Sequence, residues 1–248
     1  MPDNDIVRVD KQKLAATIAR IKADGPARFH VLADFDYTMT RAFYDGKKLP
    51  TIIAQLRDGT HLTPDYAARA QALFDTYHLL EFDAPLSFAF RTEKMHEWWS
   101  THYQLLVECG LDKQVMDEIA ASRSVRFRPG ALELVDLLHT HQVPLITMSA
   151  APAYMIREQL RIEGRLYDSA HVIANEYSYD AAGHVTGIRE PIIHSLNKSE
   201  TTIATYPIFE TIKNRANVLL MGDALEDKGM IGSFPYMNLI TIGFCYKP

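Results

Sequence analysis

The stretch that decides the fold is Phe29-His30-Val31-Leu32-Ala33-Asp34-Phe35-Asp36-Tyr37-Thr38, an apolar run that opens into two carboxylates. The apolar part predicts a buried strand, and a parallel α/β sheet places its chemistry at the carboxyl ends of its strands. In extended backbone, residues i and i+2 point to the same side, so Asp34 and Asp36 can face one reacting atom. A solvated acidic loop tip is the alternative when this segment is taken alone.

Two further polar groups follow in an order that suits phosphoryl transfer. Ser149 and Ala150 come after the apolar run 143–148, where they offer a hydroxyl and a backbone N–H to a phosphate oxygen. Lys198 supplies a compact positive charge that can neutralise phosphate. Taken singly, such a serine is typical of a turn or helix cap, and such a lysine of a solvated surface.

A second acidic turn follows the apolar run 218–221. It contains Asp223 and Asp227, and alone it would be typical of a loop or a helix N-terminus, where carboxylates are stabilised by the helix dipole. Its place after another predicted strand puts it at the same edge of the sheet as Asp34. Carboxylate oxygens without a Cys/His cluster favour Mg²⁺ over Zn²⁺.

Composition narrows the class of function. The chain has 248 residues and a net charge of −5 with no basic block, which argues against a nucleic-acid polymer as partner and predicts a small-molecule substrate. Cys109 and Cys245 lie far apart with no metal-type spacing, so we expect free thiols in a reducing compartment. The N-terminus is acidic and no stretch is long enough to span a bilayer, so we expect a cytoplasmic protein without a membrane partner.

Periodicity predicts an α/β fold, a doubly wound parallel sheet with an inserted helical cap. Between the first strand and the next clear one, near Leu145, lie about 110 residues of mainly helical pattern, too many for an ordinary crossover. We therefore expect a catalytic core of residues 1–44 and 125–248 and a cap of residues 45–124. Helices are expected over 10–23, 63–77, 92–109 and 112–121. Later strands are expected near 143–149, 171–175, 217–222 and 239–243.

Taken together, this order of motifs resembles the haloacid dehalogenase superfamily of phosphotransferases. Segments 40–47, 96–99, 128–130 and 193–198 further resemble the pyrimidine 5′-nucleotidase family, also called cytosolic 5′-nucleotidase III, one branch of which accepts 7-methylguanosine monophosphate. The similarity runs from about residue 28 to about residue 243. It implies an Mg²⁺-dependent enzyme that hydrolyses nucleoside 5′-monophosphates through an aspartyl phosphate.

The resemblance assigns roles at the strand ends. It implies that Asp34 is the nucleophile and that Asp36 is the general acid and base, with a pKa raised by the neighbouring carboxylates. Thr38 is expected to order the loop that carries them. Mg²⁺ is expected between Asp34, the carbonyl of Asp36 and Asp223, with Asp227 bound to the ion or next to its ligands.

Ser149, the N–H of Ala150 and Lys198 would hold the oxygens of the transferring phosphate. These groups bind the part of the substrate that all phosphomonoesters share. We therefore expect residues of the insertion to recognise the nucleoside.

Two residues of the insertion, Glu81 and Trp99, match positions that contact the base in the family. Glu81 would accept from an amino or ring N–H, and Trp99 would stack on the base, with added attraction for a cationic methylated purine. Phe43 is expected on the opposite face of the base, with simple packing as the alternative. Trp98 and Trp99 cannot both face inward on one helix, and the family match favours Trp99 for the pocket.

Three features depart from the family pattern. His102 stands where a serine is usual beside the base, and a protonated imidazole there would repel a methylated purine. Ala151 replaces a glycine, which is tolerable if φ is negative. The chain ends at Pro248, where family members continue through another strand and helix, so we expect a truncated chain or a short sheet edge.

Two other functions stay open on sequence grounds. One is a phosphatase of the same superfamily that acts on a non-nucleotide phosphomonoester such as phosphoserine or a sugar phosphate. The other is a non-catalytic member of the fold that binds nucleotides. The sequence favours a monomer but does not decide the oligomeric state, and it leaves open pyrimidine against 7-methylguanosine substrates.

Overall fold

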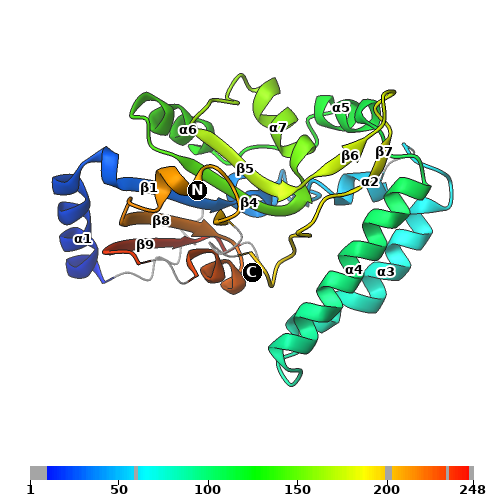
Figure 1. Ribbon diagram of the computed structural model, residues 1–248, viewed down its shortest axis with the longest axis horizontal. Helices are drawn as coiled ribbons and strands as arrows, with labels where there is room; N and C mark the ends of the chain where they lie inside the picture. The colour runs from blue at the N-terminus through cyan, green and yellow to red at the C-terminus, as the bar shows by residue number, and fades with distance from the viewer. Residues whose placement is uncertain (1–9, 59–60, 199–202, 233–234, 246–248) are drawn as a thin grey trace.

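The computed structural model describes residues 10–58, 61–198, 203–232 and 235–245, and a five-stranded sheet lies at its centre (Figure 1). The strands run in the order β5-β4-β1-β8-β9, and every neighbouring pair is parallel. This confirms the predicted α/β sheet. The strands are β1 (Phe29–Asp34), β4 (Leu145–Pro152), β5 (Ala170–Asn175), β8 (Asn217–Gly222) and β9 (Asn238–Gly243).

Both faces of the sheet are buried, as a doubly wound fold requires. Along β1, Val31 and Ala33 belong to one hydrophobic core and Leu32 to a second core. The first core includes apolar side chains of α6 (Ala131–Thr140) and α7 (Ala153–Ile162). The second includes side chains of α9 (Phe209–Ile212) and of the 3₁₀ helix η3 (Leu225–Ile231). Burial on both faces explains why the strands read as continuous apolar runs.

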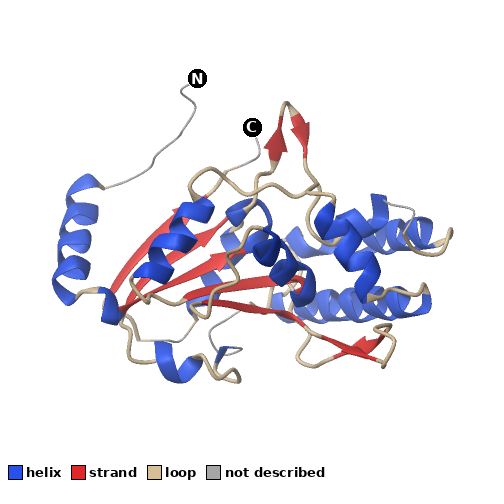
Figure 2. Ribbon diagram, turned by 90° about the horizontal axis from the view of Figure 1, so that it is seen from above, coloured by secondary structure: helices blue, strands red, loops and turns tan. Residues whose placement is uncertain are grey.

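A polar network fastens the first helix to the amino end of the sheet. Helix α1 (Lys11–Asp24) begins at its N-cap Asp10. Asn217 of β8 donates to Asp24, Asn238 of β9 donates to Asn217, and Arg20 of α1 donates to Asn238. In both views α1 lies at one end of the molecule, away from the long helices of the insertion (Figures 1 and 2).

The segment after β1 is mostly helical. A small hairpin, β2 (Phe43–Tyr44) and β3 (Lys47–Lys48), leads into the short helix α2 (Ala54–Asp58). Helices α3 (Tyr66–Phe82) and α4 (Phe88–Glu108) then run side by side away from the sheet (Figures 1 and 2). Helix α4 begins before the predicted Thr92, because the hydroxyl of Ser87 caps it by accepting from the N–H of Phe90.

Helix α5 (Lys113–Ala121), which begins after its N-cap Asp112, lies against α7 of the core. The hydroxyl of Tyr154 on α7 donates to the carboxylate of Asp117 on α5. The antiparallel hairpin β6 (Tyr177–Tyr179) and β7 (Val185–Ile188) was not predicted, and β7 packs on α4. In the described part of the chain, no helix is both long and apolar enough to cross a membrane.

Candidate active site

The predicted chemical groups meet at the point where the strand order reverses. Strand β1 lies between β4 and β8, and Asp34 at its carboxyl end pairs in register with Met148 of β4. Ser149 is therefore one residue beyond the partner of Asp34, while Gly222 ends β8 on the other side. Such a switch point is where open α/β sheets bind ligands. Strand β4 continues through Pro152, so Ser149 and Ala150 lie within an irregular strand end rather than after the strand.

The loop after Asp34 is a tight turn, Phe35–Met39, in which Tyr37 has a φ of 62°. The hydroxyl that orders this turn belongs to Thr40, which accepts from the N–H of Tyr37 at 2.9 Å. Thr38 is also buried in this turn, but its hydroxyl has no hydrogen-bond partner among the described residues, so its expected role in ordering the loop stays a prediction. Arg128 also holds the turn, since its guanidinium donates to the carbonyls of Tyr37 and Thr38.

Lys198 lies between two carboxylates. Its Nζ is 2.5 Å from Oδ1 of Asp34 and 3.3 Å from Oδ1 of Asp227, and all three side chains are buried. Burial lowers the pKa of Lys198, but the charges of Asp34 and Asp227 outweigh burial and raise it above its ordinary value. The ammonium group is therefore charged and fixed at the site.

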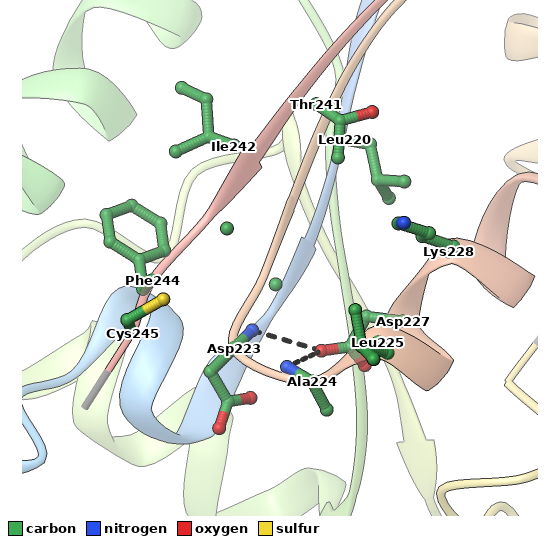
Figure 3. Close-up of a pocket in the computed structure, with 12 residues that line it drawn as sticks. Leu220, Asp223, Ala224, Leu225, Asp227, Lys228, Thr241, Ile242, Phe244 and Cys245 are labelled. Atoms are coloured by element: carbon green, nitrogen blue, oxygen red, sulfur yellow. Dashed lines mark hydrogen bonds between the residues drawn. The ribbon is translucent and has the colours of Figure 1, made fainter. Parts of the chain in front are cut away.

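Asp227 holds the turn that carries Asp223. Its Oδ2 accepts from the backbone N–H groups of Asp223 and Ala224, each at 3.1 Å (Figure 3). A Cβ on Gly222 would lie 2.6 Å from Oδ2 of Asp227, so only glycine fits there. Both carboxylate oxygens of Asp227 thus accept hydrogen bonds from the protein, and the turn is fixed relative to Lys198.

The donor set fits a hard divalent cation. Asp34, Asp223 and Asp227 each offer an oxygen, and these oxygens lie within 4.8 Å of one another. Burial, together with the neighbouring carboxylates, raises the pKa of Asp223 to about 8. Burial likewise raises the pKa of Asp34 to about 6, although Lys198 opposes it, and the buried Oδ2 of Asp34 has no hydrogen-bond partner among the described residues. A cation would stabilise the ionised form of carboxylates that otherwise raise one another's pKa.

Asp36 is held by the segment that leads to the insertion. Its Oδ1 accepts from the backbone N–H of Ile52 at 2.8 Å. Burial, and secondly the charge of Asp34, raise the pKa of Asp36 to about 7. The carboxyl group can therefore carry a proton near neutral pH, which is what a general acid needs.

Ser149 is buried, and its Oγ accepts from the N–H of Ala151 at 3.1 Å. The φ of Ala151 is not positive, so alanine is tolerated in place of glycine as expected. The carbonyl of Ala150 accepts from Tyr103 and Asn175, two residues that the sequence did not single out. Neither carries a motif, because their importance depends on contacts across distant segments.

The two neighbouring tryptophans of α4 face different surroundings. Trp98 stacks on Tyr77 of α3 at an interplanar angle of 8° and meets Phe74 edge-on. Trp99 lies beside His102 and Tyr103, with ring centroids 6.2 and 5.5 Å away. Trp98 therefore belongs to the packing of α3 on α4, and Trp99 lies on the same side of α4 as Tyr103, which reaches the carbonyl of Ala150.

His102 is buried, and its Nε2 is 2.9 Å from the hydroxyl of Tyr66. Burial, and secondly the charge of Arg57, lower the pKa of His102 to about 4. The ring is neutral at physiological pH, so the charge repulsion considered for this position does not arise there.

Glu81 and Phe43 lie at the edges of the insertion. The carboxylate of Glu81 is largely buried at the end of α3 and lies 3.7 Å from Nδ1 of His78. Phe43 is 45% exposed on the β2–β3 hairpin. Nothing in the structure brings Phe43 against Trp99, so its place opposite the base stays a prediction.

A pocket of about 230 Å³ opens beside the acidic turn, between the ends of β8 and β9 (Figure 3). Asp223, Asp227 and Lys228 line one side, and Phe244 and Cys245 line the other. The guanidinium of Arg128 lies 4.2 Å from the ring centroid of Phe244, which joins this wall to the turn after β1. Asp223 is thus one of the residues that line this pocket.

Relatives with known names are similar over most of the chain. The 7-methylguanosine phosphate-specific 5′-nucleotidase A of Xenopus laevis is 29% identical over 97% of this chain and 83% of its own length. The human 7-methylguanosine phosphate-specific 5′-nucleotidase is 24% identical over 92% of this chain and 76% of its own length.

Among solved structures, cytosolic 5′-nucleotidase IIIB bound to cytidine matches with a TM-score of 0.82 at 25% identity, over 94% of this chain and 78% of that chain. A hydrolase of the haloacid dehalogenase family from Salmonella enterica matches with a TM-score of 0.51 at 14% identity, over 90% of this chain and 68% of that chain, which shows the shared fold. The family model for pyrimidine 5′-nucleotidase (UMPH-1) matches residues 37–248. The chain therefore belongs to the pyrimidine 5′-nucleotidase (UMPH-1) family, a family of hydrolytic enzymes with the haloacid dehalogenase fold.

Proposed function

We propose that this protein is an Mg²⁺-dependent 5′-nucleotidase that hydrolyses nucleoside 5′-monophosphates through a phosphate ester of Asp34. The observation that carries the proposal is the buried contact of Asp34 with Lys198 beside Asp223 and Asp227, at the switch point of the sheet. Membership of the nucleotidase family supports the same reaction class.

In the proposed reaction, a carboxylate oxygen of Asp34 attacks phosphorus and the bond to the 5′-oxygen of the nucleoside breaks. The proton of Asp36 goes to that leaving oxygen, which the pKa of about 7 supports. Asp36 then takes a proton from the water that hydrolyses the aspartyl phosphate. Because the Ile52 N–H already holds Oδ1 of Asp36, the other oxygen is available to carry the proton.

Fixed positive and dipolar groups would hold the phosphate during both steps. The contact of Lys198 with Asp34, and the position of Ser149 and Ala150 directly after the strand partner of Asp34, support this role. Mg²⁺ held by Asp34, Asp223 and the carbonyl of Asp36, with Asp227 holding the turn, would neutralise charge on the phosphate oxygens. Lys198 is charged when the substrate arrives, because the carboxylates of Asp34 and Asp227 raise its pKa.

For the substrate, we propose both pyrimidine monophosphates and 7-methylguanosine monophosphate, recognised by residues of a cap at 45–124. The relatives named for 7-methylguanosine phosphate support the methylated purine as a substrate. The related structure bound to cytidine supports pyrimidines. Trp99 offers a flat face for stacking, and Glu81 a carboxylate for the base N–H edge. The neutral state of His102 supports acceptance of a cationic base. A relative is named a putative cytosolic 5′-nucleotidase, which supports a cytosolic location.

Phosphate release from CMP, UMP, 7-methyl-GMP, AMP, GMP and phosphoserine, measured with Mg²⁺, tests the proposal. Turnover of CMP, UMP and 7-methyl-GMP well above that of AMP, GMP and phosphoserine is the expected result. Preference for phosphoserine would favour the non-nucleotide phosphatase instead. No release from any of the six, together with tight nucleotide binding, would favour a non-catalytic member of the fold.

A further inference from the structure

The carbonyl oxygen of Ala150 accepts hydrogen bonds from two side chains and has no part in the proposed reaction. It accepts from the hydroxyl of Tyr103 at 2.6 Å and from Nδ2 of Asn175 at 2.6 Å. Tyr103 comes from α4 in the insertion, and Asn175 ends β5 of the sheet. Both residues are buried, each with 1% of its surface exposed. A carbonyl with two buried donors is fixed in position more firmly than an ordinary loop carbonyl.

Asn175 also fixes the segment that leads to Lys198. Its Nδ2 donates to the carbonyl of Ile193 and its Oδ1 accepts from the N–H of Ile193, both at 2.8 Å. Only one orientation of the amide satisfies these bonds, because a flip would place Oδ1 against two carbonyls. Asn175 therefore holds the end of β4 and the Lys198 segment at a fixed separation.

The Ala150 carbonyl is coupled to Ser149 through one peptide group. The N–H of that peptide belongs to Ala151 and donates to Oγ of Ser149. Donors on the carbonyl polarise the peptide, which makes this N–H a stronger donor. Because Oγ of Ser149 already accepts the N–H of Ala151, its own proton is directed to another acceptor.

We propose that Tyr103 and Asn175 are positioning residues that orient the Ser149 hydroxyl toward a phosphate oxygen. This rests on the proposed function, in which Ser149 holds that oxygen. Tyr103 also lies against Trp99, with ring centroids 5.5 Å apart. The same side chain therefore joins the proposed base-binding surface to the phosphate-binding strand end.

The variants Tyr103→Phe and Asn175→Asp test this proposal. The first removes one donor, and the second replaces a donor by an oxygen that faces two carbonyls. The matched control is Asn217→Asp, which alters an equally buried, hydrogen-bonded amide at the amino end of the same sheet. The measurements are the affinity for inorganic phosphate with Mg²⁺, by calorimetry and by inhibition of turnover, the affinity for cytidine, and the Tm.

Both variants are expected to weaken phosphate binding about 10-fold, the usual effect of losing one buried hydrogen bond. Cytidine binding should change less than about twofold, and the control should leave both affinities unchanged whatever its Tm. Unchanged phosphate affinity in folded Tyr103→Phe overturns the proposal, as does equal weakening by the control. A wild-type protein that binds phosphate but does not turn over CMP contradicts the proposed function, while the phosphate affinities of the variants still decide the positioning role.

Discussion

Nζ of Lys198 lies 2.5 Å from Oδ1 of Asp34, although 164 positions separate the two residues in the chain. Both side chains are buried, so each charge depends on the other for its stability. The contact places the predicted nucleophile and the predicted phosphate-binding cation at one point.

Replacing Lys198 by methionine should lower kcat/KM about 100-fold or more, because a fixed positive charge at the phosphate is lost. It should also destabilise the fold by about 3 kcal/mol, since Asp34 and Asp227 lose their buried partner. Steady-state kinetics and denaturant unfolding measure the two effects. Lys213→Met, which removes an exposed ion pair with Glu210, is the control and should change stability by less than about 0.5 kcal/mol. Equal effects of the two variants would contradict the role of Lys198.

Removal of divalent cations with excess EDTA should abolish turnover, and added Mg²⁺ should restore it. Asp223→Asn should raise the Mg²⁺ concentration needed for half-maximal activity about 10-fold or more, because the variant loses a charged oxygen ligand. The control is Asp136→Asn, which alters a carboxylate that is paired with Arg165 and lies away from Asp34, Asp223 and Asp227. It should leave the Mg²⁺ requirement unchanged. Full activity in EDTA would contradict the assigned cofactor.

Trp98 and Trp99 offer a matched pair for testing base recognition. Trp99→Ala should lower the ratio of kcat/KM for 7-methyl-GMP over GMP, by up to about thirtyfold, because stacking of indole on a cationic base is lost. Trp98→Ala should leave this ratio unchanged and lower the Tm instead, since Trp98 packs on Tyr77 of α3. The stacking argument fails if wild type does not prefer 7-methyl-GMP over GMP or if both variants shift the ratio alike.

Acid should destabilise the protein through His102. Its pKa is lowered to about 4 in the folded state, against about 6.5 when unfolded, so the unfolded chain binds more protons between these values. The contribution of neutral His102 to the free energy of unfolding is therefore fully present above about pH 6.5 and is lost as the pH falls toward 4.

Denaturant unfolding at a series of pH values between 7.5 and 4.5 tests this. His102→Gln should show a shallower loss of stability on acidification than wild type. The control is His184→Gln, because the Asp180 carboxylate raises the pKa of exposed His184 and its contribution has the opposite sign. If His102→Gln leaves the pH dependence of the unfolding free energy unchanged, His102 is not a neutral buried ring with a lowered pKa.

The pattern of apolar residues along the chain predicted where the strands of the sheet end. Other residues of the site were identified only from contacts in the structure. The apolar runs that end at Asp34, Ser149 and Asp223 predicted the sheet, because strands buried on both faces need continuous apolar sequence. The sequence did not single out Thr40, whose hydroxyl accepts from the N–H of Tyr37, since sequence does not say which of two nearby hydroxyls meets a backbone N–H.

Two side chains that fix the end of β4 left no signal in the sequence. Tyr103 and Asn175 meet at one carbonyl from α4 and β5, and no spacing rule relates them. The β6–β7 hairpin was missed because its strands are short, at three and four residues. The helical pattern between the first two sheet strands was predicted from its length, whereas the contact of α5 with α7 depends on tertiary packing.

The central claim is that Asp34 is the nucleophile of a nucleotidase, and one comparison tests it most directly. Phosphate release from CMP with Mg²⁺ is measured for wild type and for Asp34→Asn, with the Tm of both recorded. The account predicts turnover by wild type and at least about a 1,000-fold loss in a folded Asp34→Asn protein, because an amide cannot form the phosphate ester. Turnover by folded Asp34→Asn within tenfold of wild type would contradict it.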